Sequence, residues 1–277
     1  MSFQSVTESQ REFFLRARLL YDFGCEKNQL TILQGSIFMS SFQNSFAPDK
    51  DFRFWFNNAI HVATLMGLHR QNIERELQPA MHRLCRRIWW LLFQRDVMFS
   101  LAGFENVRLI NDAEVDVRPL TVTDWLEQSD VDLPQPLTTI PTITDIQMQF
   151  FIENCKLTKL GARCLRLLRQ ADMTPSMEQV RSVGDAIIAW RRALPKELRA
   201  DTASPWSDTD VWVAVIHAFS YRLECLFYRT LLRHVDKASP TDIGLVNQRL
   251  LNAMFELSTV LRRAMTHEVL LSGPPAL

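Results

Sequence analysis

The side chains best suited to chemistry in this sequence are one acid and the bases near it. Asp96 lies inside a long apolar stretch, where a carboxylate is expected to be buried and to need an oppositely charged partner. The candidate partners are the basic side chains His69, Arg70, Arg86 and Arg87. We interpret Asp96 as half of a buried ion pair that ties two helices together, in preference to a catalytic acid or base.

The side chains that could bind a metal give little support for a metal site. His61 and His69 are eight positions apart, too far for two ligands on consecutive helical turns. Asp112, Glu114 and Asp116 alternate, but they lack the turn-forming glycine of a calcium loop. The cysteines fit neither a zinc pattern nor a disulfide framework, because they are dispersed at positions 25, 85, 155, 164 and 225. We therefore expect no metal or cofactor in this chain and a reducing compartment around it.

Composition and motifs argue against several other classes. The chain contains no phosphate-binding glycine loop, no HExxH and no GxSxG. Its 31 basic and 31 acidic residues cancel, whereas nucleic-acid-binding proteins usually carry a basic excess. The most apolar run, Ile88 to Phe93, is far shorter than the roughly 20 residues that span a bilayer. We expect neither direct nucleic-acid binding nor a membrane span.

Helical periodicity accounts for most of the chain. The clearest stripe of apolar side chains runs from Phe52 to Met66, and Gly67 follows as a C-terminal cap. The next predicted helix runs from Pro79 to about Ala102 and is apolar around most of its circumference, which predicts a central position. Further helices are predicted at 13–23, 30–38, 146–169, 180–194, 212–231 and 250–261. The predicted fold is all-α, a multi-helix bundle of about eight or more helices.

One stretch lacks the helical period. Residues 109–141 contain four prolines, and their acids outnumber their bases. Loops of this length are usually functional or mobile. We therefore predict two packed lobes joined by a long acidic loop within one continuous domain: an N-terminal lobe at 1–108, an extended connector at 109–145 and a C-terminal lobe at 146–277.

Two motifs in the N-terminal half stand out by their order. Gly67-Leu68-His69-Arg70 is followed by Arg86-Arg87-Ile88-Trp89-Trp90 and then by Asp96. This order resembles the signature of the fungal-specific transcription factor domain, the middle homology region of binuclear zinc cluster regulators. Similar elements extend over roughly residues 10–265. The chain departs from the family at Gly103-Phe104-Glu105, where the family has Gly-Arg-Pro, so any contact of that arginine is lost.

The resemblance implies a regulatory role in the nucleus. It places DNA binding and zinc in a cysteine cluster outside this chain, whose five dispersed cysteines cannot supply six clustered ligands. The chain would then be an excised or truncated piece of a longer factor. Its expected partners are an apolar small-molecule effector, transcriptional co-regulators or an intramolecular activation segment. A switch of this kind requires different affinities for two states.

Aromatic side chains are the candidates for an effector pocket. The chain has 18 Phe and seven Trp. We expect the adjacent Trp89 and Trp90 to point about 100° apart and to pack in the core. The candidate pocket residues are Trp55, Phe93, Phe99, His217 and Phe219.

Two alternatives remain open. In the first, the chain is complete from Met1 and reuses the fold as an enzyme or as a carrier of an apolar metabolite. A polar residue such as Asp96, His69, His217 or Glu224 would then face a cavity. In the second, the chain is a scaffold that works through its surface and exposes an apolar patch of more than a few hundred Å2. No sustained heptad pattern predicts the family's coiled-coil dimer here.

Overall fold

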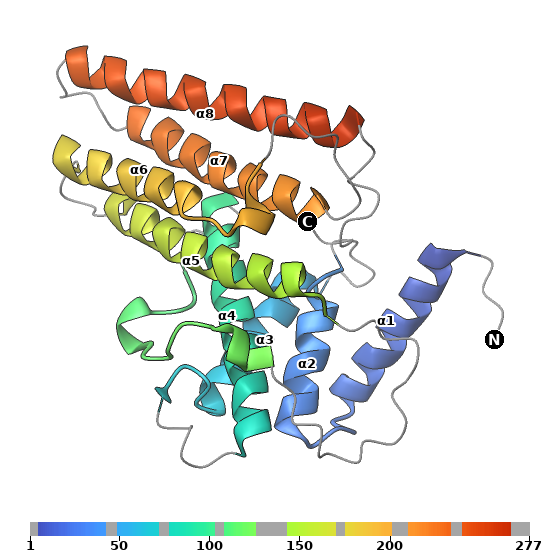
Figure 1. Cartoon of the computed structure of the whole chain (residues 1–277). Coiled ribbons are helices and arrows are strands. Elements are labelled where there is room, and N and C mark those ends of the chain that lie inside the picture. Colours follow the sequence, from blue (N-terminus) through green and yellow to red (C-terminus); the bar gives the residue numbers. More distant parts are fainter. Residues whose placement is uncertain are drawn as a thin grey trace. The chain divides into compact units, whose positions relative to one another are not determined.

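Helices form the regular structure of this chain. The computed structural model describes residues 5–42, 49–71, 78–102, 108–125, 143–169, 175–200, 210–233 and 240–266, and no strand occurs within these ranges. The α-helices of the described ranges are α1 Val6–Asp22, α2 Gln29–Met39, α3 Phe52–Leu65, α4 Pro79–Ala102, α5 Asp145–Leu168, α6 Met177–Arg192, α7 Val211–Leu232 and α8 Pro240–Thr266 (Figure 1). Three short 3-10 helices accompany them: η2 Asp112–Glu114, η3 Val122–Trp125 and η4 Lys196–Leu198. The predicted all-α class is confirmed.

The predicted helix bounds agree best with the structure where the apolar stripes are long. Helix α4 has the predicted bounds, and α3 ends where Gly67 was expected to cap it. Helices α1 and α8 begin seven and ten residues earlier than their apolar stripes predict. Helix α1 starts at Val6, because the Ser5 side chain accepts a hydrogen bond from the backbone N–H of Glu8 and caps a polar first turn. Helix α8 likewise starts at Pro240, a residue tolerated in a first turn.

The chain forms two compact units. Unit 1 contains Met1–Leu92 and Leu109–Arg118, and unit 2 contains Phe93–Arg108 and Pro119–Leu277. The division falls inside α4. The three-part division predicted at 1–108, 109–145 and 146–277 stays a prediction, because part of the acidic connector, residues 126–142, lies outside the described ranges. The turn expected at Gly103 also lies outside them.

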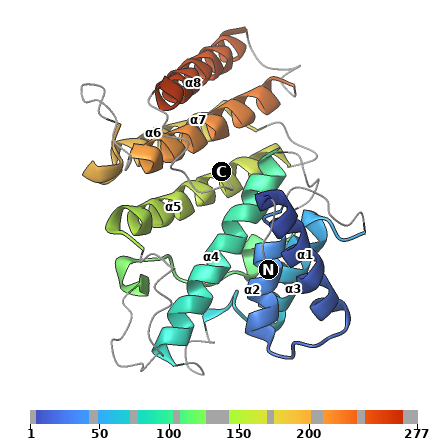
Figure 2. The same ribbon diagram turned by 90° about the vertical axis from the view of Figure 1, so that its right-hand side faces the viewer.

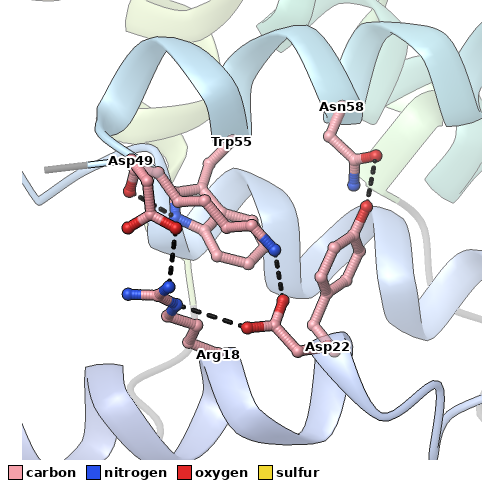
Figure 3. A network of polar contacts seen from close by, with 7 residues as sticks. Arg18, Asp22, Asp49, Trp55 and Asn58 are labelled. Atoms are coloured by element: carbon pink, nitrogen blue, oxygen red, sulfur yellow. Dashed lines mark hydrogen bonds and ion pairs between the residues drawn. The ribbon is translucent and has the colours of Figure 1, made fainter. Parts of the chain in front are cut away.

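Aromatic packing stabilises unit 1. The indole of Trp55 is 2% exposed and meets Phe14, Tyr21 and Phe54 edge to face, at centroid distances of 6.4, 5.0 and 5.1 Å. Polar contacts between α1 and the start of α3 surround this cluster (Figure 3). Arg18 donates to Asp49 at 2.7 Å and pairs with Asp22, which Lys50 also contacts. These contacts hold α1 against α3 and the residues just before it.

Unit 2 is built from α5 to α8, which lie side by side, with the C-terminal end of α4 (Figures 1 and 2). Its core contains Cys164, Ile187, Ile216 and Phe227, each fully buried. Two glycines permit close helix approach. A Cβ at Gly161 would lie 3.1 Å from Val97, and a Cβ at Gly184 would overlap the hydroxyl of Tyr228. A methyl group at 184 would therefore require the Tyr228 side chain on α7 to move.

Helix α8 packs on α7 through small side chains and not through its most hydrophobic ones. The stripe of Leu250, Met254, Leu257 and Leu261 is the most apolar pattern of the helix. Met254 and Leu261 are 53% and 41% exposed, and the buried side chains are Val246, Ala253, Val260 and Ala264. Small residues allow α8 to approach α7 closely. A search for strongly hydrophobic side chains does not detect such a face.

No helix of the described ranges is long and apolar enough to cross a membrane.

Candidate functional site

The first signature motif turns the chain at the end of α3. Gly67 has a φ of +76°, and the backbone N–H of Leu68 donates to the carbonyl of Ala63 at 3.0 Å. These two features define the Schellman motif, in which a left-handed residue closes the helix. Gly67 is needed because other residues are strained in this conformation. The turn delivers His69 into the interior, where it is 7% exposed.

The imidazole of His69 is oriented by its neighbours in unit 1. Arg70 Nε donates to His69 Nε2 at 3.0 Å, and the ring centroid lies 5.7 Å from that of Trp89. Burial lowers the pKa of His69, and the charge of Arg70 adds to this effect, while Glu114 and Asp116 oppose it. The ring is therefore neutral near pH 7. Because Nε2 accepts a hydrogen bond, the proton is assigned to Nδ1, which has no hydrogen-bond partner.

The two adjacent tryptophans are both buried but make different contacts. Trp90 Nε1 donates to the carbonyl of Arg118 at 3.0 Å. Trp89 is 1% exposed, and its Nε1 donor has no partner. A buried donor without an acceptor costs about 1–3 kcal/mol. His69 Nδ1–H and Trp89 Nε1–H are thus two buried donors, on neighbouring rings, that lack an acceptor.

The residues after the 3-10 helix η2 are tied to the first motif. The backbone N–H of Asp116 donates to the carbonyl of His69 at 3.2 Å, and its carboxylate accepts from the N–H of Gln71 at 2.5 Å. Together with the bond from Trp90 to Arg118, these contacts fix the described start of the acidic segment against the signature residues. All of them lie within unit 1.

The second motif contributes two arginines with different environments. Arg86 is buried, and its Nη2 lies 2.8 Å from Nε2 of His82, one turn earlier on α4. Arg87 is half-buried. This arrangement brings a guanidinium into contact with an imidazole within one helix. It places the arginines of the motif in the interior and at its border instead of on an open basic surface.

Asp96 forms a buried ion pair, but with a residue absent from its predicted partners. Its Oδ2 accepts from Arg108 Nε at 2.9 Å, and the two side chains are 1% and 9% exposed. The Arg108 guanidinium also lies 5.0 Å from the ring centroid of Phe93. The pair connects α4 to the segment that follows it, twelve residues later. His69 and Arg70, two of the predicted partners, belong to unit 1.

A second polar cluster lies in unit 2, between α6 and α7. Arg191 Nη2 donates to Glu224 Oε2 at 2.5 Å, and its Nε donates to Ser220 Oγ at 3.1 Å. The guanidinium stacks 4.0 Å from the ring centroid of Tyr221. One turn before Ser220, the buried His217 donates through Nε2 to the carbonyl of Leu198 at 3.1 Å. We name these side chains of Arg191, His217, Ser220, Tyr221 and Glu224 the α6–α7 polar cluster.

The α6–α7 polar cluster was only partly visible in the sequence. Glu224 and His217 stand inside apolar stretches, as Asp96 does, and both were named as polar residues that could face a cavity. Arg191 ends the apolar stripe of α6 and gave no signal of its own. A charged residue at the end of one helix finds its partner only once the next helix is in place.

Comparison with known proteins settles the family. Residues 2–199 match the model of the fungal specific transcription factor domain. The chain belongs to this family. The resemblance carried by the two motifs is thereby confirmed, and this chain is a middle domain of the fungal transcription factor type.

Three relatives illustrate where the domain occurs. The fusaric acid cluster transcription factor of Fusarium oxysporum f. sp. lycopersici is 30% identical over 96% of this chain and 39% of its own length. The acetamidase regulatory protein of Aspergillus fumigatus is 29% identical over 74% of this chain and 25% of its own length. Cutinase transcription factor 1 beta of Fusarium vanettenii is 34% identical over 42% of this chain and 13% of its own length. The fungal transcription factor domain thus spans well under half of these proteins. No solved structure matches it significantly.

Three of the five cysteines of this fungal transcription factor domain, Cys85, Cys155 and Cys164, are buried core residues. Burial raises the pKa of Cys155 and of Cys164 to about 12, so both thiols stay protonated. Within the described residues, no group of three or more His, Cys, Asp or Glu side chains could hold a metal ion. In this family zinc belongs to the separate DNA-binding cluster.

The predicted pocket residues fall into both units of the domain. Trp55 packs in the aromatic cluster of unit 1, and its Nε1 donates to the carbonyl of Lys50 at 3.1 Å. Phe93, Phe99, His217 and Phe219 belong to unit 2, where Phe99 and Phe219 are half-buried. A pocket that uses all five stays a prediction. The signature region offers a more specific candidate, because its two unpartnered donors lie within one unit.

Acid should destabilise this fungal transcription factor domain through His217. Burial lowers the pKa of His217 to about 4, and the charge of Arg191 lowers it further, whereas the bond to Leu198 opposes the shift. Because the folded pKa lies below the unfolded value of about 6.5, neutral His217 stabilises the fold above pH 6.5. This contribution, about 3 kcal/mol, is lost as the pH falls from 6.5 to about 4.

Urea unfolding at a series of pH values checks this expectation. His217→Gln should remove this part of the pH dependence, whereas His61→Gln at an exposed position of α3 should keep it. Equal pH profiles for the wild type and His217→Gln would contradict a neutral, buried His217.

Proposed function

We propose that this chain is the effector-sensing regulatory domain of a nuclear fungal transcription factor and binds no DNA itself. The family match, the transcription factor relatives and the zero net charge support this role. In this proposal the DNA contacts and the zinc belong to parts of the full-length factor outside this chain. Those parts of the factor, together with the effector, determine which genes are regulated and which co-regulators bind.

The unpartnered donors of His69 and Trp89 carry the effector proposal. Both N–H groups are more than nine-tenths buried and belong to rings 5.7 Å apart. An effector that is mainly apolar but has one acceptor oxygen, such as a carbonyl or carboxylate, would satisfy both donors. Each new hydrogen bond would remove a desolvation cost of about 1–3 kcal/mol. The state in which the donors are arranged in this way would therefore be favoured by the effector.

The contacts of the signature residues suggest how binding is read out. His69 accepts from Asp116 through its carbonyl, and Trp90, next to Trp89, holds Arg118. An effector seated on His69 and Trp89 would therefore act on the same residues that fix the start of the acidic segment. We include in the proposal the predicted architecture, two lobes at 1–108 and 146–277 joined by the acidic connector at 109–145. Displacement of the connector would then expose or cover a surface for co-regulators or for an intramolecular activation segment.

Native mass spectrometry of the protein purified from its fungal host tests the effector proposal. We expect a small molecule with an acceptor oxygen that stays bound in the native spectrum and is lost on denaturation. Trp89→Phe should lose this molecule because it removes an unpartnered donor. Trp90→Phe is the matched control: it removes the neighbouring indole donor, which already binds Arg118, and should keep the molecule. A chain without any bound molecule, or equal occupancy in Trp89→Phe, would overturn the proposal.

The alternative of an enzyme or carrier receives less support. It requires an ionisable residue that faces a cavity, with Asp96, His69, His217 or Glu224 as candidates. Asp96 is paired with Arg108 and Glu224 with Arg191, and His217 donates to Leu198. These contacts favour structural roles for three of the four. His69 remains, and its free donor fits recognition of an acceptor better than proton transfer.

A further inference from the structure

Helix α8 exposes a second apolar face that its packing on α7 does not use. The face contains Leu251, Met254, Phe255, Leu261 and Met265, which are 64%, 53%, 69%, 41% and 69% exposed. The opposite side, with Ala253, Val260 and Ala264, is buried with Ala214 of α7. Both views place α8 at the margin of unit 2, outside α7 (Figures 1 and 2). The apolar face is thus turned away from the helix that holds α8.

The exposed side chains of α8 follow the spacing of a helix-pairing seam. Positions 251, 254, 258, 261 and 265 are separated by three, four, three and four residues, as in the a and d positions of a heptad repeat. At 100° per residue, Phe255 and Arg262 complete a stripe about 120° wide. We name Leu251, Met254, Phe255, Ser258, Leu261, Arg262 and Met265 the α8 seam. It is only two heptads long, which explains why no sustained heptad pattern is evident in the sequence.

The α8 seam is large enough to be more than scattered surface residues. Its five exposed apolar side chains present on the order of 500 Å2, above the few hundred Å2 usual for isolated patches. A shallow, open hollow of about 690 Å3 lies along its C-terminal half, and the described residues that line it, Met254, Leu257, Leu261 and Met265 among them, all belong to α8. If a matching face covered the seam, the total buried area would reach about 1,000 Å2, where specific interfaces begin.

We propose that the α8 seam docks a second copy of this chain, so that two α8 helices pair around a twofold axis near Ser258. The apolar positions lie seven, four and three residues before Ser258 and three and seven residues after it. This near-symmetry places apolar side chains against apolar side chains when a copy is rotated onto the seam. The charged member, Arg262, lies toward the edge of the stripe, where its guanidinium can remain in water. Two heptads predict a weak dimer that depends on concentration.

Sedimentation velocity of the whole chain, from low micromolar to several hundred micromolar, tests the pairing. The wild type should shift from monomer to dimer as its concentration rises. Leu251→Glu should weaken the dimer at least about tenfold, because it would bury a carboxylate without a partner. Asn252→Glu adds the same charge one residue away, outside the seam, and should leave the dimer intact. Circular dichroism confirms that each variant is folded. A wild-type monomer at all concentrations, or a dimer unaffected by Leu251→Glu, would overturn the proposal.

Disulfide trapping locates the axis independently of affinity. In a Cys25→Ser background, which removes an exposed native thiol, Ser258→Cys should give a covalent dimer on mild oxidation. Glu256→Cys, exposed on the same helix but about 160° around it from Ser258, should not. Dimers from Glu256→Cys alone would place the contact elsewhere. The pairing does not depend on the effector site, so failure of either proposal leaves the other open to its own test.

Discussion

Asp96→Ala should lower the free energy of unfolding by about 3–5 kcal/mol, because it leaves the buried Arg108 guanidinium without its carboxylate. The loss should appear in urea unfolding followed by circular dichroism. Glu12→Ala provides the comparison, since the Glu12–Arg16 pair on α1 lies at the surface and contributes only about 0–1 kcal/mol. A loss at Asp96 no larger than that at Glu12 would contradict the buried pair.

A double substitution tests whether the loss of stability comes from leaving one buried charge without its partner. Asp96→Leu combined with Arg108→Met removes both charges and keeps similar volumes. The double variant should recover most of the stability that either single change loses, because a buried ion pair is often replaceable by apolar side chains. If it remained as unstable as Asp96→Ala, Asp96 would have a further role that Arg108 does not share.

Glu224→Ala should destabilise unit 2 by about 3 kcal/mol. It removes the carboxylate from Arg191, whose side chain is 16% exposed, and leaves the guanidinium with Ser220 and the ring of Tyr221. Those two contacts place the loss at the lower end of the range for a broken buried pair. Glu224→Gln, which keeps a hydrogen-bond acceptor, should lose about half as much. Urea unfolding of the three proteins measures both effects.

A result that contradicts the Glu224→Ala prediction would also be informative about the α6–α7 polar cluster. Equal stability of Glu224→Ala and the wild type would mean that Arg191 finds another acceptor or reaches water. Arg191→Met distinguishes these cases. It should cost about as much as Glu224→Ala if the two charges depend on each other, because it leaves the carboxylate buried instead.

The helices were predictable from the sequence where one apolar stripe determines them. Helix α4 begins at Pro79 and α3 ends before Gly67 because a proline suits a first turn and a left-handed glycine closes a last one. The first turns of α1 and α8 were missed, since polar residues form helix there without any periodic signal. The buried face of α8 could not be predicted from its apolar stripe, because small residues such as Ala253 gain their contacts from proximity and not from size.

The candidate site was predictable in its members but not in its pairings. A carboxylate at Asp96 signalled burial and the need for a base, yet Arg108 stands in a segment without periodicity and becomes a neighbour only after the chain folds back. Trp89 and Trp90 carry identical side chains in adjacent positions. Which of their two donors finds an acceptor depends on where Arg118 lies, and that position is set by tertiary contacts.

The close approach of α6 and α7 at Gly184 links two positions that are far apart in the chain. A methyl group at 184 would overlap the hydroxyl of Tyr228, whose ring is buried and whose pKa burial raises to about 12. Position 184 is therefore not free to change alone. Alanine at 184 becomes acceptable only in a lineage that has first shortened the side chain at 228. The volume of the Tyr228 hydroxyl thus constrains the order in which substitutions at 184 and 228 can occur during evolution.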